Sequence, residues 1–307
     1  MSSQLRFLIL WLFIILTACK KDPLEEVNPK SIDLRLSTVT SYVYNTPQQK
    51  TEFIYEDQLL VQALEFELVD NEWLQSALTI VDYTNVNIGL TYEYLLNGQW
   101  IKSSYLELYL KNDLLMERKV FCQNETDWIE EGKYVYSYRD GRLIDEVYSP
   151  IINGEYQLEY KTMCFYKEDR LFEIRDYEIQ QVILWVCNRI FAFNTIDADH
   201  IEIIESVKNN LDEWDPIKSY QLRFENGRIS EYTTPEGSIN FMYDEYGNLI
   251  QESNSAGEQI IYSYETGKGN AALLYMNPFV NQMGFPSIKS TQANANIRSL
   301  IEMKTHE

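Results

Sequence analysis

The chain has 307 residues and a formal net charge of −21 at pH 7, with 47 acidic against 26 basic side chains. Nucleic acid and anionic lipid headgroups repel such an acidic protein, which excludes both as partner surfaces. Because 45% of the residues are apolar, the chain can bury a core, and disorder is not its default state. The length suits one large all-β domain or two smaller ones.

Residues 1–18 predict a signal peptide. Met1 to Arg6 is short and carries one positive charge, and an apolar run from Phe7 to Ile15 follows. This run is too short for a stable transmembrane helix and is typical of the apolar region of a secretory signal. An ordinary signal peptide with a chance cysteine and an uncleaved single-pass anchor are the alternatives.

The next residues, Leu16, Thr17, Ala18 and Cys19, resemble the lipobox of bacterial prolipoproteins at every position. The resemblance implies cleavage after Ala18, a diacylglyceryl thioether on Cys19 and acylation of the new amino group. Two or more acyl chains anchor a protein stably, whereas one chain binds marginally. We therefore expect lipidation at Cys19, with the membrane as a partner through this residue.

Residues 19–35 predict a flexible tether, because they are charged and poor in strand formers. The stretch from Lys20 to Glu26 resembles the surface-export signals of Bacteroidota lipoproteins. We expect a lipid-anchored protein of the bacterial outer membrane, and periplasm-facing and surface-exposed attachment both stay open.

Residues 36–267 predict a β-hairpin repeat domain. When Trp100, Trp128 and Trp214 are aligned without gaps, the positions six, eight and ten residues later are apolar or aromatic in every copy. Residue pairs that tolerate positive φ follow, and an apolar position returns fifteen residues after each tryptophan. Each unit therefore consists of Trp, loop, strand, tight turn and strand. The aligned apolar positions are Leu106, Leu108, Leu110 and Leu115; Tyr134, Tyr136, Tyr138 and Leu143; Tyr220, Leu222, Phe224 and Ile229.

Glycines 227, 237, 247 and 257 lie ten residues apart, which is the length of a strand plus a turn. This region resembles the YD repeats of Rhs-type proteins, whose arrays wind into a β-sheet shell around a toxin. The residues that carry the resemblance are Tyr243, Asp244, Gly247, Leu249, Gly257 and Tyr264. This chain departs from those proteins in having few units and no recognisable cargo domain.

A second resemblance is to short Bacteroidota lipoproteins of unknown function. Its marks are the lipobox, the Asn97-Gly98-Gln99-Trp100 stretch, and a tail with Gly267 to Ala271 followed by Asn277 to Phe279. The expected fold class is therefore all-β: an antiparallel meander of YD-like β-hairpin repeats in an open, curled or solenoid-like sheet. Residues 268–307 form a C-terminal tail segment, in which the spacing of Ile297, Leu300 and Ile301 predicts a short helix.

Catalytic and metal-binding patterns are weak. A nucleophilic cysteine needs a nearby base, usually histidine, but the chain has only His200 and the penultimate His306. Asp197, Asp199 and His200 are typical of a solvated acidic turn rather than of a metal site. We expect no enzyme, cofactor or metal. For Cys122, Cys164 and Cys187, one disulfide with a free thiol and three buried thiols both stay open.

The expected role is binding or scaffolding, with a glycan or an envelope protein as the partner. Exposed tyrosine and tryptophan can stack on sugars, although the repeated positions of Trp100, Trp128 and Trp214 favour packing within the sheet. Two other functions are left open: a polysaccharide hydrolase that uses paired carboxylates, and an accessory or immunity factor of a Rhs-type toxin. Two carboxyl groups about 5–10 Å apart in a cleft would favour the hydrolase.

Overall fold

The computed structural model describes residues 34–266, except 85–86, 112–113, 125, 141, 168–169, 181–183, 227 and 246. The predicted signal peptide, Cys19, most of the predicted tether and the C-terminal helix around Ile297 lie outside this part. The described residues form strands and turns and contain no helix. Accordingly, no helix of the described part has the length and apolarity needed to cross a membrane.

The described residues form nineteen antiparallel strands that follow one another along the chain. Their bounds are β1 Leu34–Val43, β2 Thr46–Glu56, β3 Leu59–Val69, β4 Glu72–Tyr83, β5 Asn87–Leu96, β6 Gln99–Lys111, β7 Leu114–Asn124, β8 Asp127–Arg139, β9 Arg142–Ile152, β10 Glu155–Tyr156, β11 Tyr160–Lys167, β12 Arg170–Gln180, β13 Leu184–Thr195, β14 His200–Lys208, β15 Trp214–Glu225, β16 Arg228–Thr234, β17 Gly237–Tyr243, β18 Leu249–Asn254 and β19 Glu258–Thr266.

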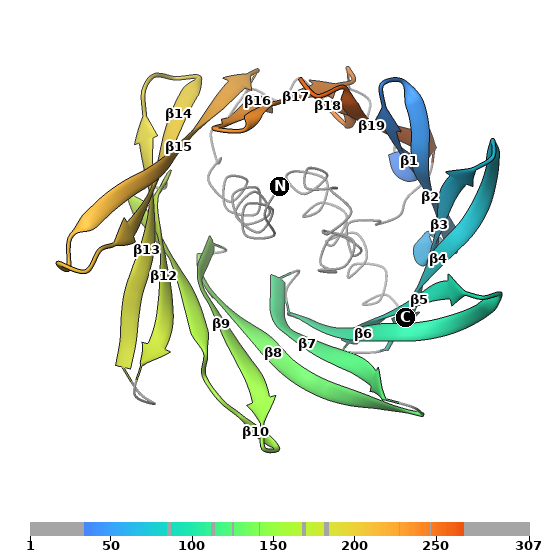
Figure 1. Ribbon diagram of the computed structural model, residues 1–307, viewed down its shortest axis with the longest axis horizontal. Coiled ribbons are helices and arrows are strands. Elements are labelled where there is room, and N and C mark those ends of the chain that lie inside the picture. The colour runs from blue at the N-terminus through green and yellow to red at the C-terminus, as the bar shows by residue number, and fades with distance from the viewer. Residues whose placement is uncertain are drawn as a thin grey trace.

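The sheet closes into a barrel (Figure 1). Each strand pairs with its neighbours in the sequence, and β1 also pairs with β19 from Leu34 opposite Thr266 to Val43 opposite Glu258. The two-residue strand β10 only extends the hairpin after β9, because β9 pairs directly with β11. The closed ring of the described part therefore has 18 strands, which are the nineteen without β10.

Closure corrects the predicted fold class. An open, curled or solenoid-like sheet of YD-like repeats has two free edges, whereas here every strand of the ring is paired on both sides. Closing a sheet removes the unpaired edge groups that would otherwise recruit other strands. Most strand pairs also contain a register shift, for example between Glu65 and Phe66, and such bulges increase twist and bending.

The tight turns agree with the predicted turn residues. Asp140 and Asn226 have φ values of 53° and 51°, and they link β8 to β9 and β15 to β16. Asn97 and Gly98 likewise have φ values of 51° and 79° between β5 and β6. Positive φ suits two-residue hairpins because the turn then matches the twist of the strands. The predicted hairpins after Trp128 and Trp214 are confirmed by the pairing of these strands.

The barrel has an apolar inner face and a charged outer face. Register partners share a face, so the buried positions can be followed from strand to strand, as from Leu90 through Leu106 to Val120. These positions form one continuous apolar cluster around the barrel. The outer face carries ion pairs in the middle of its strands, for example Lys133 with Glu117 at 3.4 Å. Three further pairs are Lys161 with Asp145, Lys119 with Glu130, and Arg175 with Glu173.

Leu34 and Thr266 lie side by side at one end, here called the terminal end. Near this end six tyrosine hydroxyls each donate a hydrogen bond, 2.8–2.9 Å long, to a backbone carbonyl of the adjacent strand. Tyr83 and Tyr138 lie ten residues after Trp73 and Trp128, so this repeat position forms a cross-strand latch where it holds a tyrosine; after Trp100 and Trp214 it holds Leu110 and Phe224. The six pairs are Tyr55 to Leu36, Tyr83 to Leu60, Tyr138 to Leu115, Tyr166 to Leu143, Tyr243 to Ile229 and Tyr264 to Leu249.

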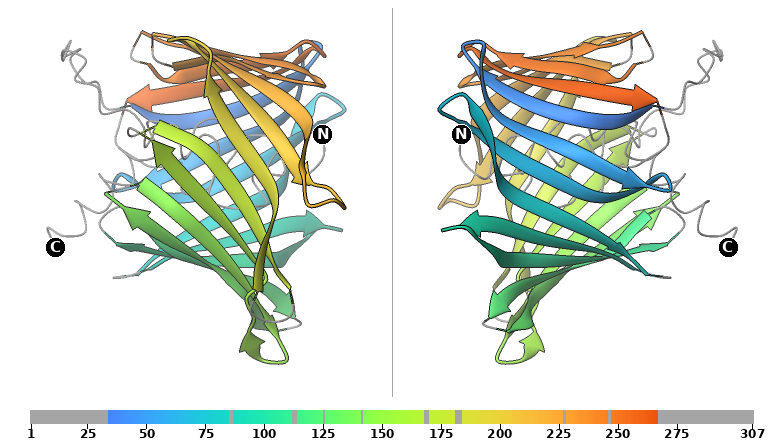
Figure 2. Two further views of the ribbon diagram at one scale, coloured as in Figure 1. Left: turned by 90° about the vertical axis from the view of Figure 1, so that its left-hand side faces the viewer. Right: turned by 90° about the vertical axis from the view of Figure 1, so that its right-hand side faces the viewer.

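The opposite end, here called the distal rim, contains the turns that follow β1, β3, β5, β7, β9, β12, β14, β16 and β18 (Figure 2). Fifteen of the twenty exposed large apolar side chains in the described residues lie within four residues of these turns. They are Val43, Tyr44, Val69, Leu74, Leu95, Leu96, Trp100, Ile129, Ile152, Tyr156, Leu158, Leu184, Leu211, Trp214 and Ile217.

Candidate functional site on the inner face

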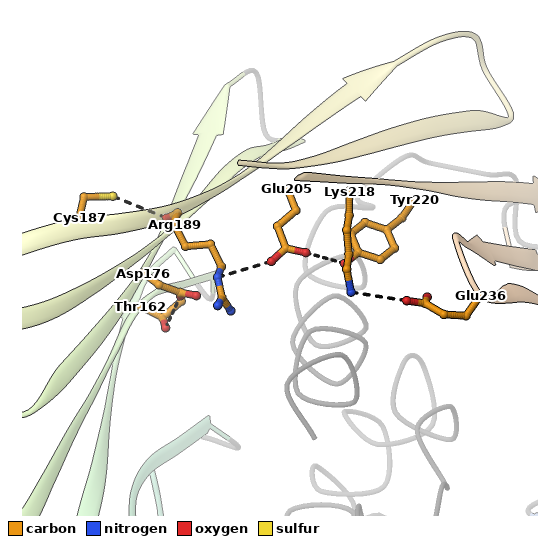
Figure 3. Close-up of polar contacts among 8 residues, drawn as sticks. All are labelled: Thr162, Asp176, Cys187, Arg189, Glu205, Lys218, Tyr220 and Glu236. Atoms are coloured by element: carbon orange, nitrogen blue, oxygen red, sulfur yellow. Dashed lines mark hydrogen bonds and ion pairs between the residues drawn. The ribbon is translucent and has the colours of Figure 1, made fainter. Parts of the chain in front are cut away.

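A row of polar side chains crosses the inner face from β11 to the turn between β16 and β17. Thr162 donates a 2.8 Å hydrogen bond to Asp176, whose register partner is Arg189. Arg189 lies 3.5 Å from Glu205. Figure 3 shows these side chains on the concave side of the strands and Cys187 on the opposite side. The row therefore places charged groups among the apolar residues of the inner face.

The row continues beyond Glu205. The hydroxyl of Tyr220 donates a 2.5 Å hydrogen bond to Glu205, and Lys218 lies 3.5 Å from Glu236 (Figure 3). Burial raises the pKa of Asp176, while the hydrogen bond from Thr162 and the charge of Arg189 lower it. Since acidic and basic groups alternate along the row, the charges are compensated within it, and this arrangement is typical of a structural polar layer.

A second cluster joins the row through strand register. Tyr136 of β8 pairs with Glu146 of β9, which in turn pairs with Thr162. The Arg118 guanidinium lies 4.0 Å from the centroid of the Tyr134 ring, and both Arg118 and Glu146 are buried. Burial raises the pKa of Glu146 to about 7 although Arg118 and hydrogen bonds from tyrosines lower it. Here too the acid has a basic neighbour.

A cavity of about 300 Å³ differs from these rows in its charge. It lies on the other side of the barrel, at β2 to β5, and its inner-face lining includes Glu65 and Glu67. The remaining lining residues are Gln49, Lys50, Thr51, Phe66, Ser76, Ala77, Tyr92, Tyr94 and Leu95. The ammonium group of Lys50 lies 2.6 Å from Glu52 and 4.8 Å from the centroid of the Phe66 ring, so it is paired on the outer face.

The carboxyl groups of the cavity influence one another. Burial, together with the charge of Glu67, raises the pKa of Glu65 to about 7. Burial and these two carboxylates raise the pKa of Tyr92 to about 12. At neutral pH Glu65 is therefore divided between its acid and carboxylate forms, and the cavity combines acceptors, hydroxyl donors and two aromatic rings. This set suits a neutral polyhydroxyl ligand or a cation.

The three cysteines of the described part lie on separate strands, Cys122 on β7, Cys164 on β11 and Cys187 on β13. All three are thiols rather than disulfide partners; Cys164 is buried and the other two are half-buried. Of the two arrangements left open by the sequence, the disulfide is therefore absent among these three. The Cys187 thiol points to the carbonyl of Arg189 at 3.6 Å.

The acidic turn lies between β13 and β14, where His200 Nδ1 is 2.7 Å from Asp197. Both side chains are exposed, and no group of three or more potential metal ligands is present in the described residues. His306 and Cys19 lie outside the described part.

The tryptophan prediction needs correction. Trp100 and Trp214 are 41% and 38% exposed at the distal rim, so they do not pack the inside of the sheet. Trp128 is half-buried and its ring lies 5.7 Å from that of Tyr105 on the outer face. The repeat places these side chains outward because each follows a distal turn at the same strand position.

Sequence reasoning missed Glu65, Glu67 and Tyr92. The stretch Leu64 to Leu68 alternates apolar and acidic residues, and its pattern indicates that Leu64, Phe66 and Leu68 face the core. The structure instead places the glutamates inward and those apolar residues on the half-exposed outer face. No local signal identifies them, because the face that carries Leu64, Phe66 and Leu68 is the more apolar of the two.

Comparisons with known proteins identify structural neighbours but no family. No family model matches the chain, and no curated protein does. A porin-like protein from Bacteroides uniformis is 9% identical, with 75% of this chain and 96% of that chain covered and a TM-score of 0.40. A porin-like protein from Bacteroides vulgatus is 12% identical, with 76% and 99% covered and a TM-score of 0.36.

A protein of unknown function from Bacteroides fragilis is 11% identical, with 47% of this chain and 91% of that chain covered and a TM-score of 0.25. Because all three TM-scores are below 0.5 and the identities are below 25%, no function passes from these proteins to this chain. The functional argument rests on the chain's own residues.

Proposed function

We propose that this protein is a lipid-anchored β-barrel of the bacterial outer membrane that binds a neutral glycan in the cavity between β2 and β5. The observation that carries the proposal is that two carboxyl groups, Glu65 and Glu67, and two tyrosines, Tyr92 and Tyr94, line the same cavity. Carboxylates accept hydrogen bonds from sugar hydroxyls, and tyrosine rings stack on sugar faces while their hydroxyls donate or accept.

Attachment through acylated Cys19 suits the charged outer face of the barrel. A barrel that spans a membrane carries apolar residues outward and polar residues inward. This chain has the opposite alternation, with ion pairs such as Lys133 with Glu117 on the outer face. A barrel tethered outside the hydrocarbon layer keeps these charges in water, where they have no desolvation cost.

Calorimetric titration with soluble oligosaccharides tests the proposal. The panel contains fragments of α-glucan, β-glucan, mannan and xylan. We expect at least one to bind, and Tyr94→Ala and Glu67→Gln each to weaken that binding about tenfold, since stacking and a charged hydrogen bond each contribute about 1–3 kcal/mol. Glu231→Gln, on the outer face of β16, is the matched control. Failure of every glycan to bind would refute the proposal, as would equal binding by all three variants.

The same carboxyl pair favours a second function, the hydrolysis of a glycan. Glu65 and Glu67 are successive inner residues of β3, about 6.6 Å apart along the strand. This backbone spacing lets the two side chains project to the same side as a carboxyl pair, and the raised pKa of Glu65 suits a general acid at neutral pH. Release of reducing sugar by the unaltered protein, lost in Glu65→Gln while binding persists, would establish hydrolysis. Binding with no sugar release would leave glycan binding as the function.

A further inference from the structure

The distal rim carries a series of exposed apolar side chains. Exposed large apolar side chains are found at seven of its nine turns, and only the turns after β16 and β18 lack them. Leu211 is 78% exposed and Leu184 is 56% exposed. Monomeric proteins rarely expose apolar side chains on this scale unless the surface binds something.

All five tryptophans of the described residues belong to this rim. Trp73, Trp100, Trp128, Trp185 and Trp214 each lie on the outer face within a few residues of a distal turn. Tryptophan is enriched where proteins meet the boundary between lipid headgroups and hydrocarbon, because the ring is apolar and its N–H is polar. An outward belt of tryptophan below apolar turn tips is the arrangement that such a boundary favours.

The acidic side chains of the rim determine which headgroup charge it can approach. Asp70 and Glu72 flank the turn after β3, and Asp212 and Glu213 lie in the turn after β14. Lys208 is already paired with Asp212 at 2.5 Å. An acidic rim is repelled by anionic headgroups, so its apolar tips fit a surface of zwitterionic lipid.

The reach of the chain allows the rim and a lipid anchor to use one membrane. Fourteen residues lie between Cys19 and Leu34, so the Cα atoms of these two residues can be at most about 50 Å apart. The longest strands, such as β8 with 13 residues, are about 43 Å long. A lipidated Cys19 can therefore still reach a membrane that contacts the distal rim, although Leu34 lies at the terminal end.

From these observations we propose that the distal rim docks onto a zwitterionic lipid surface, with the tips of its hairpins inserted at the headgroup boundary. The barrel wall, with its mid-strand ion pairs, stays in water. Docking is a property of the barrel and needs no acyl chain.

Intrinsic fluorescence tests this proposal directly. We use the chain from residue 19 onward with Cys19→Ser, so that no acyl chain contributes and Trp11 is absent; every remaining tryptophan then reports on the rim. The probe is phosphatidylcholine vesicles with and without brominated acyl chains. We expect quenching by brominated lipid, weaker binding when phosphatidylglycerol is added, and partial recovery of that binding in high salt.

The variant Leu96→Asn/Leu211→Asn tests the rim, and Ile54→Asn/Ile196→Asn at the terminal end is the matched control. We expect the rim variant to lower vesicle binding about tenfold or more and the control to change it less than about twofold. Both pairs are exposed, so circular dichroism of each variant should match that of the parent protein.

Three results would overturn the proposal: no quenching by brominated lipid, equal loss of binding in both variants, or stronger binding to anionic vesicles. Analytical ultracentrifugation measures whether the rim instead joins two copies of the chain. A concentration-dependent dimer that Leu96→Asn/Leu211→Asn abolishes, without vesicle binding, would show that a second copy of the chain covers the rim and would also overturn it.

Discussion

Replacing Glu65 by glutamine should stabilise the barrel at alkaline pH and leave its stability unchanged at acidic pH. The pKa of Glu65 is raised from 4.5 to about 7 by burial and by Glu67. The folded protein therefore holds a proton between pH 4.5 and 7 that the unfolded chain has lost, so stability falls as pH rises through this window. A pKa shift of one unit corresponds to about 1.36 kcal/mol, so above pH 7 the shift of Glu65 lowers the free energy of unfolding by about 3 kcal/mol.

Urea denaturation followed by circular dichroism at pH 4.5 and pH 8 measures this effect. We expect Glu65→Gln to raise the free energy of unfolding by about 3 kcal/mol at pH 8 and by close to zero at pH 4.5, because glutamine resembles the protonated acid. Glu72→Gln, exposed at the start of β4, is the control and should change neither value. An equal gain in the free energy of unfolding at both pH values, or no gain at pH 8, would show that burial does not raise the pKa of Glu65.

Three further predictions follow from particular residues. Cys19→Ser should abolish acylation, so that mass spectrometry of the parent protein shows the mass of the acyl chains and that of the variant does not; a parent protein without this added mass would contradict lipidation. Gly247→Val should lower the melting temperature more than Gly98→Val, because both have positive φ but only the first would also push a side chain into the Arg228 guanidinium; equal melting temperatures would contradict the clash. Tyr166→Phe should cost about 1 kcal/mol of unfolding free energy in urea, since it removes one latch hydrogen bond, and an unchanged midpoint would contradict the latch.

The local architecture was predictable because turn chemistry and strand alternation are short-range properties. Asp140 and Asn226 tolerate positive φ, and the hairpins around them form as expected. The Trp73 copy was missed even though Tyr83 follows it by ten residues, because the position six residues after Trp73 is Thr79 rather than an apolar or aromatic residue.

The candidate site could not be predicted, because period-two alternation identifies two faces without showing which one turns inward. In β3 both faces contain apolar residues, so Phe66 is as good a core candidate as Ala63. Register with β2 and β4 decides the matter by placing Glu65 opposite Thr51 and Ala77. Burial of a carboxyl group, and hence its raised pKa, depends on that long-range choice.

By itself, the sequence determined the strands, their turns and the lipobox-like start, since each is specified by residues close together in the chain. Only the tertiary structure decided that β1 pairs with β19, because Leu34 and Thr266 are more than two hundred residues apart and no local pattern links them. That single pairing converts a meander into a closed barrel. It also gathers the carboxyl pair onto the inner face and the apolar turn tips onto one rim, and these two features carry the proposed functions.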